Sequence, residues 1–172
     1  MILGSWVQAG EGRGKDKVAK LMNRDQYNKW LKKLPKNYCT FCNWKEYQIV
    51  LKEGWRWIWV ANLAPYWYWH TMLVPKRHFV EYNEMNDKEA VELRDMFDYA
   101  INRYREEKLL REDGSQIKKY VFFWRLRDDT YDPISKVKRP NHFHIQIAPD
   151  KDHLWDPTLD KNAYKIDIMR LK

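Results

Sequence analysis

The chain has 172 residues, of which 32 are Lys or Arg and 24 are Asp or Glu, so its formal net charge is +8. This length is typical of one domain, and 44% hydrophobic residues with ten Trp argue against a disordered chain. No apolar run reaches about 18 residues and the start does not resemble a signal peptide, so we expect a cytoplasmic protein without a membrane partner.

The N-terminal segment carries most of the charge. Residues 1–36 contain nine Lys or Arg against three acidic residues, which amounts to +6. Between Asp16 and Lys33, apolar residues recur at loosely helical spacing and predict a basic amphipathic helix that Pro35 closes. Such a segment suits a polyanion such as nucleic acid, although a solvated helix face is the simpler interpretation of charge alone.

Patterns of period two follow and predict strands. Segments 47–51 and 55–60 are typical of two strands joined by a turn at 52–54, and a third strand covers 70–74 before Pro75. Trp55, Trp57 and Trp59 would share one face of the second strand. We interpret the Trp-rich stretch as core or interface, with base stacking as the alternative.

A long helix and two further strands complete the pattern. Asn86 or Asp87 is a suitable N-cap, and Gly114 is typical of a residue just past a helix end. The apolar stripe of this helix is expected to contain Ala90, Leu93, Phe97, Ala100, Ile101 and Tyr104. Strands are predicted at 119–126 and 142–147, so the whole order indicates an α+β fold.

The last predicted strand carries the candidate catalytic residues. Alternate side chains of a strand point to opposite faces, so His142, His144 and Gln146 would form one polar row with neighbours about 6.6 Å apart. Imidazole is a good nucleophile toward phosphorus. Histidines at alternate positions can also simply face solvent, but two of only five His lie here, just after a basic loop. We favour the catalytic interpretation.

The only two cysteines, Cys39 and Cys42, are spaced C-x-x-C. One pair cannot build the disulfide framework of a small secreted domain. The spacing is compatible with a metal site, a redox pair or two incidental thiols.

Three motifs in order resemble the histidine triad (HIT) superfamily. Its pattern His-φ-His-φ-His-φ-φ, with φ apolar, is similar to His142-Phe-His-Ile-Gln-Ile-Ala148. The stretch from Pro65 to His78 resembles the family's gH-x-L-V-x-P-K-x-H, and Cys39-Thr-Phe-Cys42 resembles its opening Cys-x-Phe-Cys. The resemblance covers residues 38–150. It implies a HIT-like antiparallel sheet of about five strands with one long helix, to which a basic N-terminal helix is added.

Gln146, where the family's motif has a third His, is similar to the branch of galactose-1-phosphate uridylyltransferases and dinucleoside polyphosphate phosphorylases. The resemblance implies that His144 attacks the α-phosphorus of a nucleotide and forms a covalent nucleotidyl-histidine. Gln146 would then hold a non-bridging oxygen. The implied activity is nucleotide phosphohydrolysis or nucleotidyl transfer on a dinucleoside polyphosphate, nucleotide sugar or phosphoramidate. The alternatives are a nucleic-acid-binding or DNA/RNA-end-processing protein that uses residues 1–36, and a member that binds nucleotide without turnover.

The same branch often has a structural zinc. The resemblance implies Cys39, Cys42, His78 and His142 as its ligands. Where zinc is absent, the residue at position 142 would instead orient the nucleophile by a hydrogen bond. His70 falls at an active-site-adjacent position, and a satisfied buried histidine is its equally good alternative.

The resemblance also implies a nucleotide pocket. Phe41, Trp44, Asn62 and Leu63 fall at positions that line the base and ribose pocket, with Asn62 where many members have Asp. The basic loop adds Lys138, Arg139 and Asn141 as candidates. We expect a homodimer with an extension at 1–36, a catalytic domain at 37–150 and a tail at 151–172.

Overall fold

A computed structural model of the chain describes residues 20–35, 38–110, 114–124, 131–132, 137–138, 141–149 and 163–172. Its helices are α1 (Arg24–Leu31), α2 (Trp44–Tyr47) and α3 (Asp87–Glu106), with 3-10 turns η1 (Tyr82–Glu84), η2 (Ala163–Lys165) and η3 (Ile168–Leu171). Its strands are β1 (Val50–Glu53), β2 (Trp57–Ala61), β3 (Thr71–Pro75), β4 (Tyr120–Phe123), β5 (Tyr131–Asp132), β6 (Val137–Lys138) and β7 (Ile145–Pro149).

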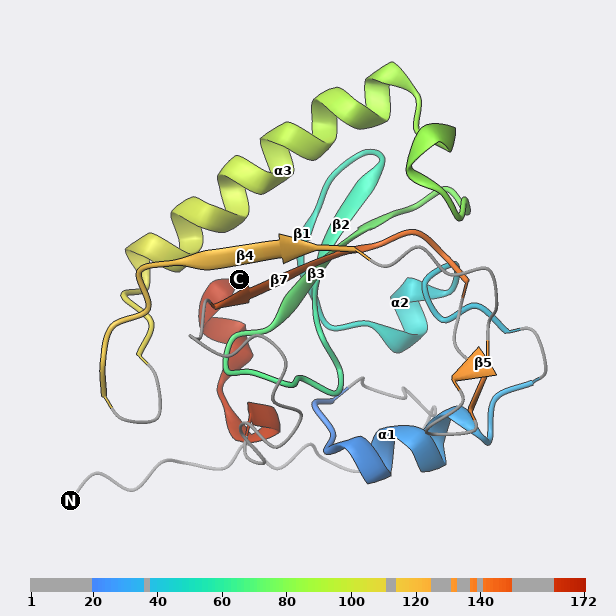
Figure 1. Cartoon of the computed structure of the whole chain (residues 1–172), viewed down its shortest axis with the longest axis horizontal. Helices are drawn as coiled ribbons and strands as arrows, with labels where there is room; N and C mark the ends of the chain where they lie inside the picture. The colour runs from blue at the N-terminus through green and yellow to red at the C-terminus, as the bar shows by residue number, and fades with distance from the viewer. Residues whose placement is uncertain are drawn as a thin grey trace, which may run out of the picture.

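Five strands form one antiparallel sheet in the order β1-β2-β3-β7-β4. The register between the central strands places Met72 of β3 opposite Gln146 of β7. Strands β5 and β6 pair separately, and β6 lies against α1. Figure 1 shows α3 above the sheet and α1 below it. The expected α+β fold, with a five-stranded sheet and one long helix, is confirmed.

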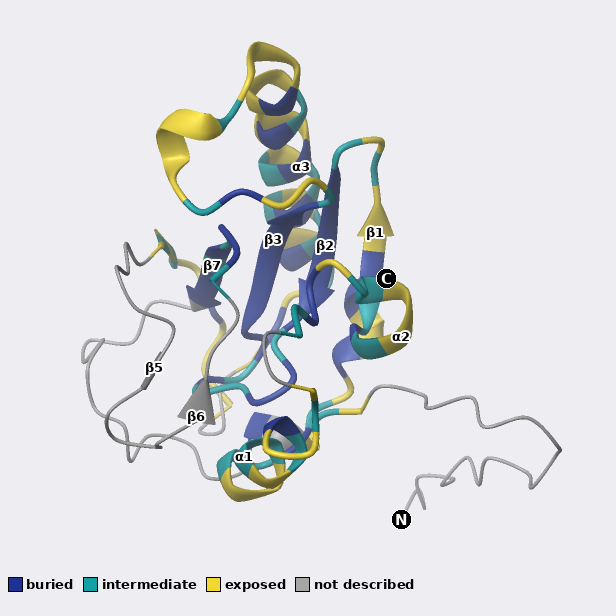
Figure 2. Cartoon of the chain, turned by 90° about the vertical axis from the view of Figure 1, so that its right-hand side faces the viewer, coloured by how far each residue is buried: buried dark blue, intermediate teal, exposed yellow. Residues whose placement is uncertain are grey.

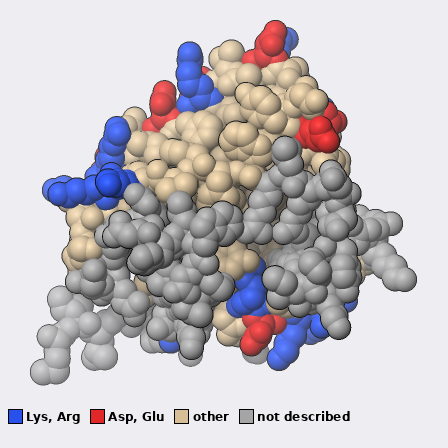
Figure 3. All heavy atoms as spheres, in the orientation of Figure 1, with Lys and Arg blue, Asp and Glu red and all other residues tan. Residues whose placement is uncertain are grey.

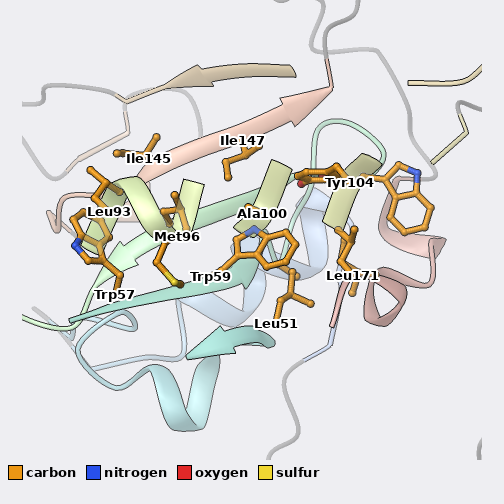
Figure 4. Close-up of a cluster of buried hydrophobic side chains, with 14 of the residues drawn as sticks. Leu51, Trp57, Trp59, Leu93, Met96, Ala100, Tyr104, Ile145, Ile147 and Leu171 are labelled. Carbon is orange, nitrogen blue, oxygen red and sulfur yellow. The ribbon is translucent and has the colours of Figure 1, made fainter. Parts of the chain in front are cut away.

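The main core lies between α3 and one face of the sheet. Trp57 and Trp59 of β2 are fully buried there against Leu93 and Met96 of α3, as Figure 4 shows. The opposite face of β2 buries Ile58 and Val60 in a second cluster. Because both faces of the central strands are covered, β2 and β3 are buried along their whole length (Figure 2).

Helix α3 begins where the sequence predicts and ends earlier. The Asn86 side chain accepts a hydrogen bond from the Glu89 backbone N–H and forms a capping box. The helix ends at Glu106, not near Gly114, because Lys108 adopts a positive φ of 47° and turns the chain. Ala90 is exposed and Met96 is buried, so the expected apolar stripe was wrong at Ala90.

Several strand boundaries also differ from the prediction. Trp55 is 89% exposed beside the β1–β2 turn, so only Trp57 and Trp59 share the core face. Strand β1 begins at Val50 because the preceding residues form α2. His142 and His144 precede β7, and the Phe143 backbone N–H donates to Phe79 O at 2.7 Å instead of joining the sheet ladder.

The described part of the basic segment contains one short helix. The capping box of Asn23 and Gln26 starts α1, and Leu31 is its buried residue. The start of the expected helix, residues 16–19, lies outside the described residues. Basic side chains gather around the place of α1 in Figure 3. Among the helices of the described residues, none is long and apolar enough to cross a membrane.

Candidate active site and metal site

A cavity opens on the sheet face that α3 does not cover. Met72 of β3 and Phe41, from the segment before α2, form part of its apolar wall. His144 and Gln146 contribute polar groups to the same cavity. The core-facing partners of this row, Phe143, Ile145 and Ile147, are buried on the α3 side. The alternation predicted from the sequence therefore places both polar side chains in the cavity.

The imidazole of His144 is oriented by the backbone. Its Nδ1 lies 2.9 Å from the carbonyl oxygen of His142. A carbonyl only accepts hydrogen bonds, so Nδ1 carries the proton and Nε2 carries the lone pair of the neutral ring. The ring also lies 5.0 Å from the Phe41 ring, centroid to centroid. In this tautomer, Nε2 is the ring nitrogen that can act as a nucleophile.

Two neighbours hold the carboxamide of Gln146. His70 Nε2 donates to Gln146 Oε1 at 2.7 Å, and Asn62 Nδ2 donates to the same oxygen at 3.2 Å. The Tyr66 backbone N–H donates to His70 Nδ1 at 3.4 Å, which fixes the His70 tautomer with its proton on Nε2. With its oxygen accepting these two bonds, Gln146 offers its amide N–H groups to a ligand.

His70 is thus both buried, at 2% exposure, and part of the site. The sequence left these two interpretations open, and the structure combines them. Asn62, which we expected to contact ribose, lines the cavity; its Nδ2 donates to Gln146, and its Oδ1 accepts from the Ala64 backbone N–H at 3.1 Å.

Cys39, Cys42, His78 and His142 come together beside the cavity. Their candidate ligand atoms all lie within 4.8 Å of one another. Cys42 Sγ is 3.1 Å from His78 Nδ1, and Cys39 Sγ is 3.3 Å from His142 Nδ1. Ligand atoms of a tetrahedral zinc lie about 3.3–3.8 Å apart. The four side chains fit such an ion.

The protonation of His142 also fits a metal ligand. Its Nε2 donates to the Pro75 carbonyl at 2.9 Å, which leaves the lone pair on Nδ1, the atom that faces the thiols. Burial lowers the pKa of His142 to about 4, so the ring is neutral at neutral pH. Burial and the Cys39 hydrogen bond raise the pKa of Cys42 to about 12, and a bound cation would favour its thiolate form.

The turn that carries His78 is anchored on both sides. Arg77 forms two hydrogen bonds of 2.8 Å to the carboxylate of Glu89, whose side chain is 3% exposed. Lys76 pairs with Glu53 at 2.7 Å. These contacts tie the turn to α3 and β1, which positions His78 opposite Cys42.

The remaining predicted nucleotide-binding residues divide into three groups. Phe41, Leu63 and Asn141 line the cavity. Trp44 is not among the described lining residues and instead lies near Lys76, whose ammonium group is 5.3 Å from the indole centroid. Arg139 and the side chain of Lys138 lie outside the described residues.

The cavity also contains residues that the sequence did not indicate. Arg24 and Tyr27 of α1 line it, and the Arg24 guanidinium stacks on the ring of Tyr66 at 3.9 Å. The backbone N–H of Met22 donates to Leu63 O at 2.7 Å and fixes this arrangement. No local pattern reveals a contact across 40 residues. Gln48 also lines the cavity. The sequence feature that could have indicated it is a polar residue at the start of an apolar strand pattern.

No family profile and no curated protein match this sequence. Many solved structures resemble its fold, among them the following three. A uridylyltransferase has a TM-score of 0.56 at 17% identity, over 86% of this chain and 48% of its own. An ADP-glucose phosphorylase from Arabidopsis thaliana, with bound ADP-glucose, has a TM-score of 0.53 at 16% identity, over 85% of this chain and 46% of its own.

The third structure is a hypothetical histidine triad nucleotide-binding protein from Sulfolobus tokodaii. It has a TM-score of 0.50 at 20% identity, over 77% of this chain and 89% of its own. This chain therefore spans about half the length of the uridylyltransferase and the phosphorylase. The chain has the fold that histidine triad proteins share with these two larger proteins.

Proposed function

We propose that this chain is a nucleotide phosphohydrolase or nucleotidyltransferase that acts on an α-phosphate through a covalent bond to His144. The observation that carries the proposal is the His144 tautomer, since the bond from Nδ1 to the His142 carbonyl leaves the lone pair on Nε2. This atom belongs to a ring that lines the same cavity as Gln146. The shared fold with an ADP-glucose phosphorylase and a uridylyltransferase supports the same chemistry.

The reaction proceeds in two displacements. The Nε2 lone pair attacks the α-phosphorus, the bond from phosphorus to the leaving oxygen breaks, and the leaving group departs with that electron pair. Water, phosphate or another acceptor then attacks the phosphorus and loses its proton, and the P–N bond returns its electrons to Nε2. Dinucleoside polyphosphates, nucleotide sugars and phosphoramidates are the proposed substrates.

Gln146 stabilises the charge on the five-coordinate phosphorus. Its amide N–H groups donate to a non-bridging oxygen, while His70 and Asn62 hold its carbonyl oxygen. A neutral carboxamide cannot protonate a leaving group. The site therefore suits leaving groups that depart as stable anions, such as phosphates.

We also propose a structural zinc held by Cys39, Cys42, His78 and His142. A zinc ion bound there would cross-link the segment before α2, the turn after β3 and the segment before β7. His142 is a proposed ligand whose carbonyl also orients His144. A bound metal would thereby fix the His142 carbonyl group, which in turn orients the His144 ring.

A homodimer remains our proposal for the assembly. Strand β4 is an outer strand of the five-stranded sheet, and Phe122 and Trp124 near its end are 39% and 46% exposed. Light scattering after size exclusion tests this proposal, and a monomer mass at micromolar concentration would reject it.

The second candidate function is recognition of a nucleic-acid end. Lys29, Lys32 and Lys33 are exposed on and just after α1, the helix that supplies a wall of the cavity. Phosphate contacts by these lysines would give binding that weakens steeply with salt. Absence of binding to single strands at low salt would remove this candidate.

The catalytic proposal is tested by intact-protein mass spectrometry. The protein is mixed with a panel of nucleotides and phosphoramidates, and we expect an added mass of one nucleotidyl group, which identifies the nucleotide. His144→Ala removes the adduct and the turnover, whereas His153→Ala, at a histidine that matches no motif, keeps both. Turnover that survives His144→Ala would overturn the mechanism.

A further inference from the structure

Gln48 is a buried polar residue in the wall of the cavity. It lies between α2 and β1, is 8% exposed and lines the same cavity as His144. Its Oε1 is buried and has no hydrogen-bond partner in the described part of the chain. A buried carbonyl without a donor destabilises the folded protein, so such a group at a cavity wall points to a donor on a ligand.

Part of the cavity wall that contains Gln48 is apolar and suits a flat ring. Val50, which begins β1 two residues after Gln48, packs with Ile58 and Val60. Leu51 belongs to the α3 side. Gln48 therefore lies two residues before the first apolar residue of this second cluster in β1. Phe41 and Leu63 line the same cavity, and a nucleobase packs well between such apolar groups.

We infer that Gln48 recognises the nucleobase, with Oε1 accepting a hydrogen bond from an exocyclic amino group. Adenine, cytosine and guanine carry such a group, whereas uracil does not. The inference rests on the proposed function and deepens it, because it assigns the base that the site prefers to the amino-bearing class. A site that pairs a buried polar group with a ligand donor discriminates strongly against analogues without that donor.

The test compares nucleotides that differ only in the amino group. Calorimetry measures the binding of adenosine and purine-riboside monophosphates, and of guanosine and inosine monophosphates, to the wild type and to Gln48→Leu. In the wild type, we expect the amino-bearing member of at least one pair to bind about tenfold or more tightly. Gln48→Leu abolishes that difference by weakening only the amino-bearing nucleotide. Gln48→Met serves as a second variant if the Leu variant folds poorly.

Asn28 supplies a matched control. Its Oδ1 is also buried without a partner among the described residues, but Asn28 does not line the cavity. Asn28→Leu should therefore leave the preference for amino-bearing bases unchanged. A wild type without such a preference, or a Gln48→Leu protein that retains it, would overturn the inference. If the wild type forms a nucleotidyl adduct in either case, the proposed catalytic function still stands.

Discussion

His70 shows how much a single side chain contributes through its neighbours. It is buried just before β3 and donates to Gln146 from Nε2, while its Nδ1 accepts from the backbone of Tyr66. Only one orientation of the ring satisfies both bonds. We therefore regard His70 as a positioning residue that acts on the reacting phosphate through Gln146.

This role predicts the outcome of two substitutions. His70→Leu removes the donor, so the Gln146 amide loses its fixed orientation and kcat falls about tenfold, with less effect on KM. His70→Gln keeps a side-chain N–H donor and should recover part of the lost kcat. Steady-state kinetics on the nucleotide identified by the adduct measure this split. An unchanged kcat for a folded His70→Leu protein would show that the contact is only structural.

Gln48 illustrates the opposite situation, in which a side chain is expected to lower the stability of the fold rather than raise it. Its buried carbonyl has no partner among the described residues. Replacing such a group by an apolar one of similar shape is often neutral or stabilising. A rise in the melting temperature of Gln48→Leu together with weaker binding of amino-bearing nucleotides would separate the two effects.

At the scale of elements, the turn after β3 connects the proposed metal site to helix α3. It carries His78 and is anchored to α3 by the ion pair of Arg77 and Glu89. The hydrogen bonds from Arg77, followed by that from the Asn86 backbone, lower the pKa of Glu89 from its ordinary value of 4.5. The carboxylate form is therefore favoured by folding.

The lowered pKa makes the contribution of Glu89 dependent on pH. A carboxyl group whose pKa is lower in the folded state stabilises the protein fully above its unfolded pKa. That stabilisation is lost as the pH falls through the folded pKa, below about 4.5. Glu89→Gln should cost about 1–2 kcal/mol at pH 7, because the half-exposed Arg77 loses its carboxylate partner and solvent compensates part of the loss. The difference from the wild type should shrink as the pH falls below this value.

Urea unfolding at a series of pH values measures this difference. Glu53→Gln, which removes the half-exposed partner of Lys76, is the control and should change stability much less. If the loss of unfolding free energy in Glu89→Gln stays constant down to pH 3, the Glu89 carboxylate is not the group that stabilises the turn.

The four proposed zinc ligands come from three separate segments, so zinc binding would connect elements that are distant in the sequence. Protein purified without added zinc should contain about one zinc per chain by elemental analysis. Cys42→Ser should remove the metal and lower the melting temperature, since His78 and His142 would lose the ion that connects them. A zinc content near zero, with both thiols open to titration, would reject the site.

At the scale of the whole molecule, the basic N-terminal segment contributes to the cavity. Arg24 is the only formally charged side chain among the described residues that line it. The guanidinium donates to Ala64 O and stacks on Tyr66, so its position is fixed next to Leu63, a predicted pocket residue. A fixed cation at the wall of a cavity attracts phosphate groups.

Arg24→Gln should therefore raise KM for a nucleotide about tenfold and change kcat less. Arg24→Lys should restore part of the affinity because it restores the charge. Arg94→Gln removes an equal charge from an exposed position on α3 and should leave both constants unchanged. If the KM of Arg24→Gln equals that of the wild type, Arg24 does not bind the nucleotide and α1 contributes only to the fold.

The sequence by itself determined the elements and the chemically reactive groups. The N-cap at Asn86, the polar row of His144 and Gln146, and the Cys-x-x-Cys pair follow from patterns that span a few residues, because capping and strand alternation are local properties. Boundaries were predicted less well. Helix α3 ends at Glu106 through the turn at Lys108, which no local signal marked.

Only the tertiary structure decided which of these groups meet. The pairing of β3 with β7 brings His70 to Gln146 across 76 positions, and the bond from Met22 to Leu63 brings α1 to the cavity. The same packing buries Gln48 in the cavity wall, a position that its polar character in the sequence did not indicate. The spacing of residues along the chain does not predict such long-range contacts, because sheet register and helix docking depend on the burial of the whole core. The net charge of +8 by itself indicated no binding site. The fold places one of the positive charges, that of Arg24, in the wall of the cavity, although the sequence assigned this residue to an N-terminal extension.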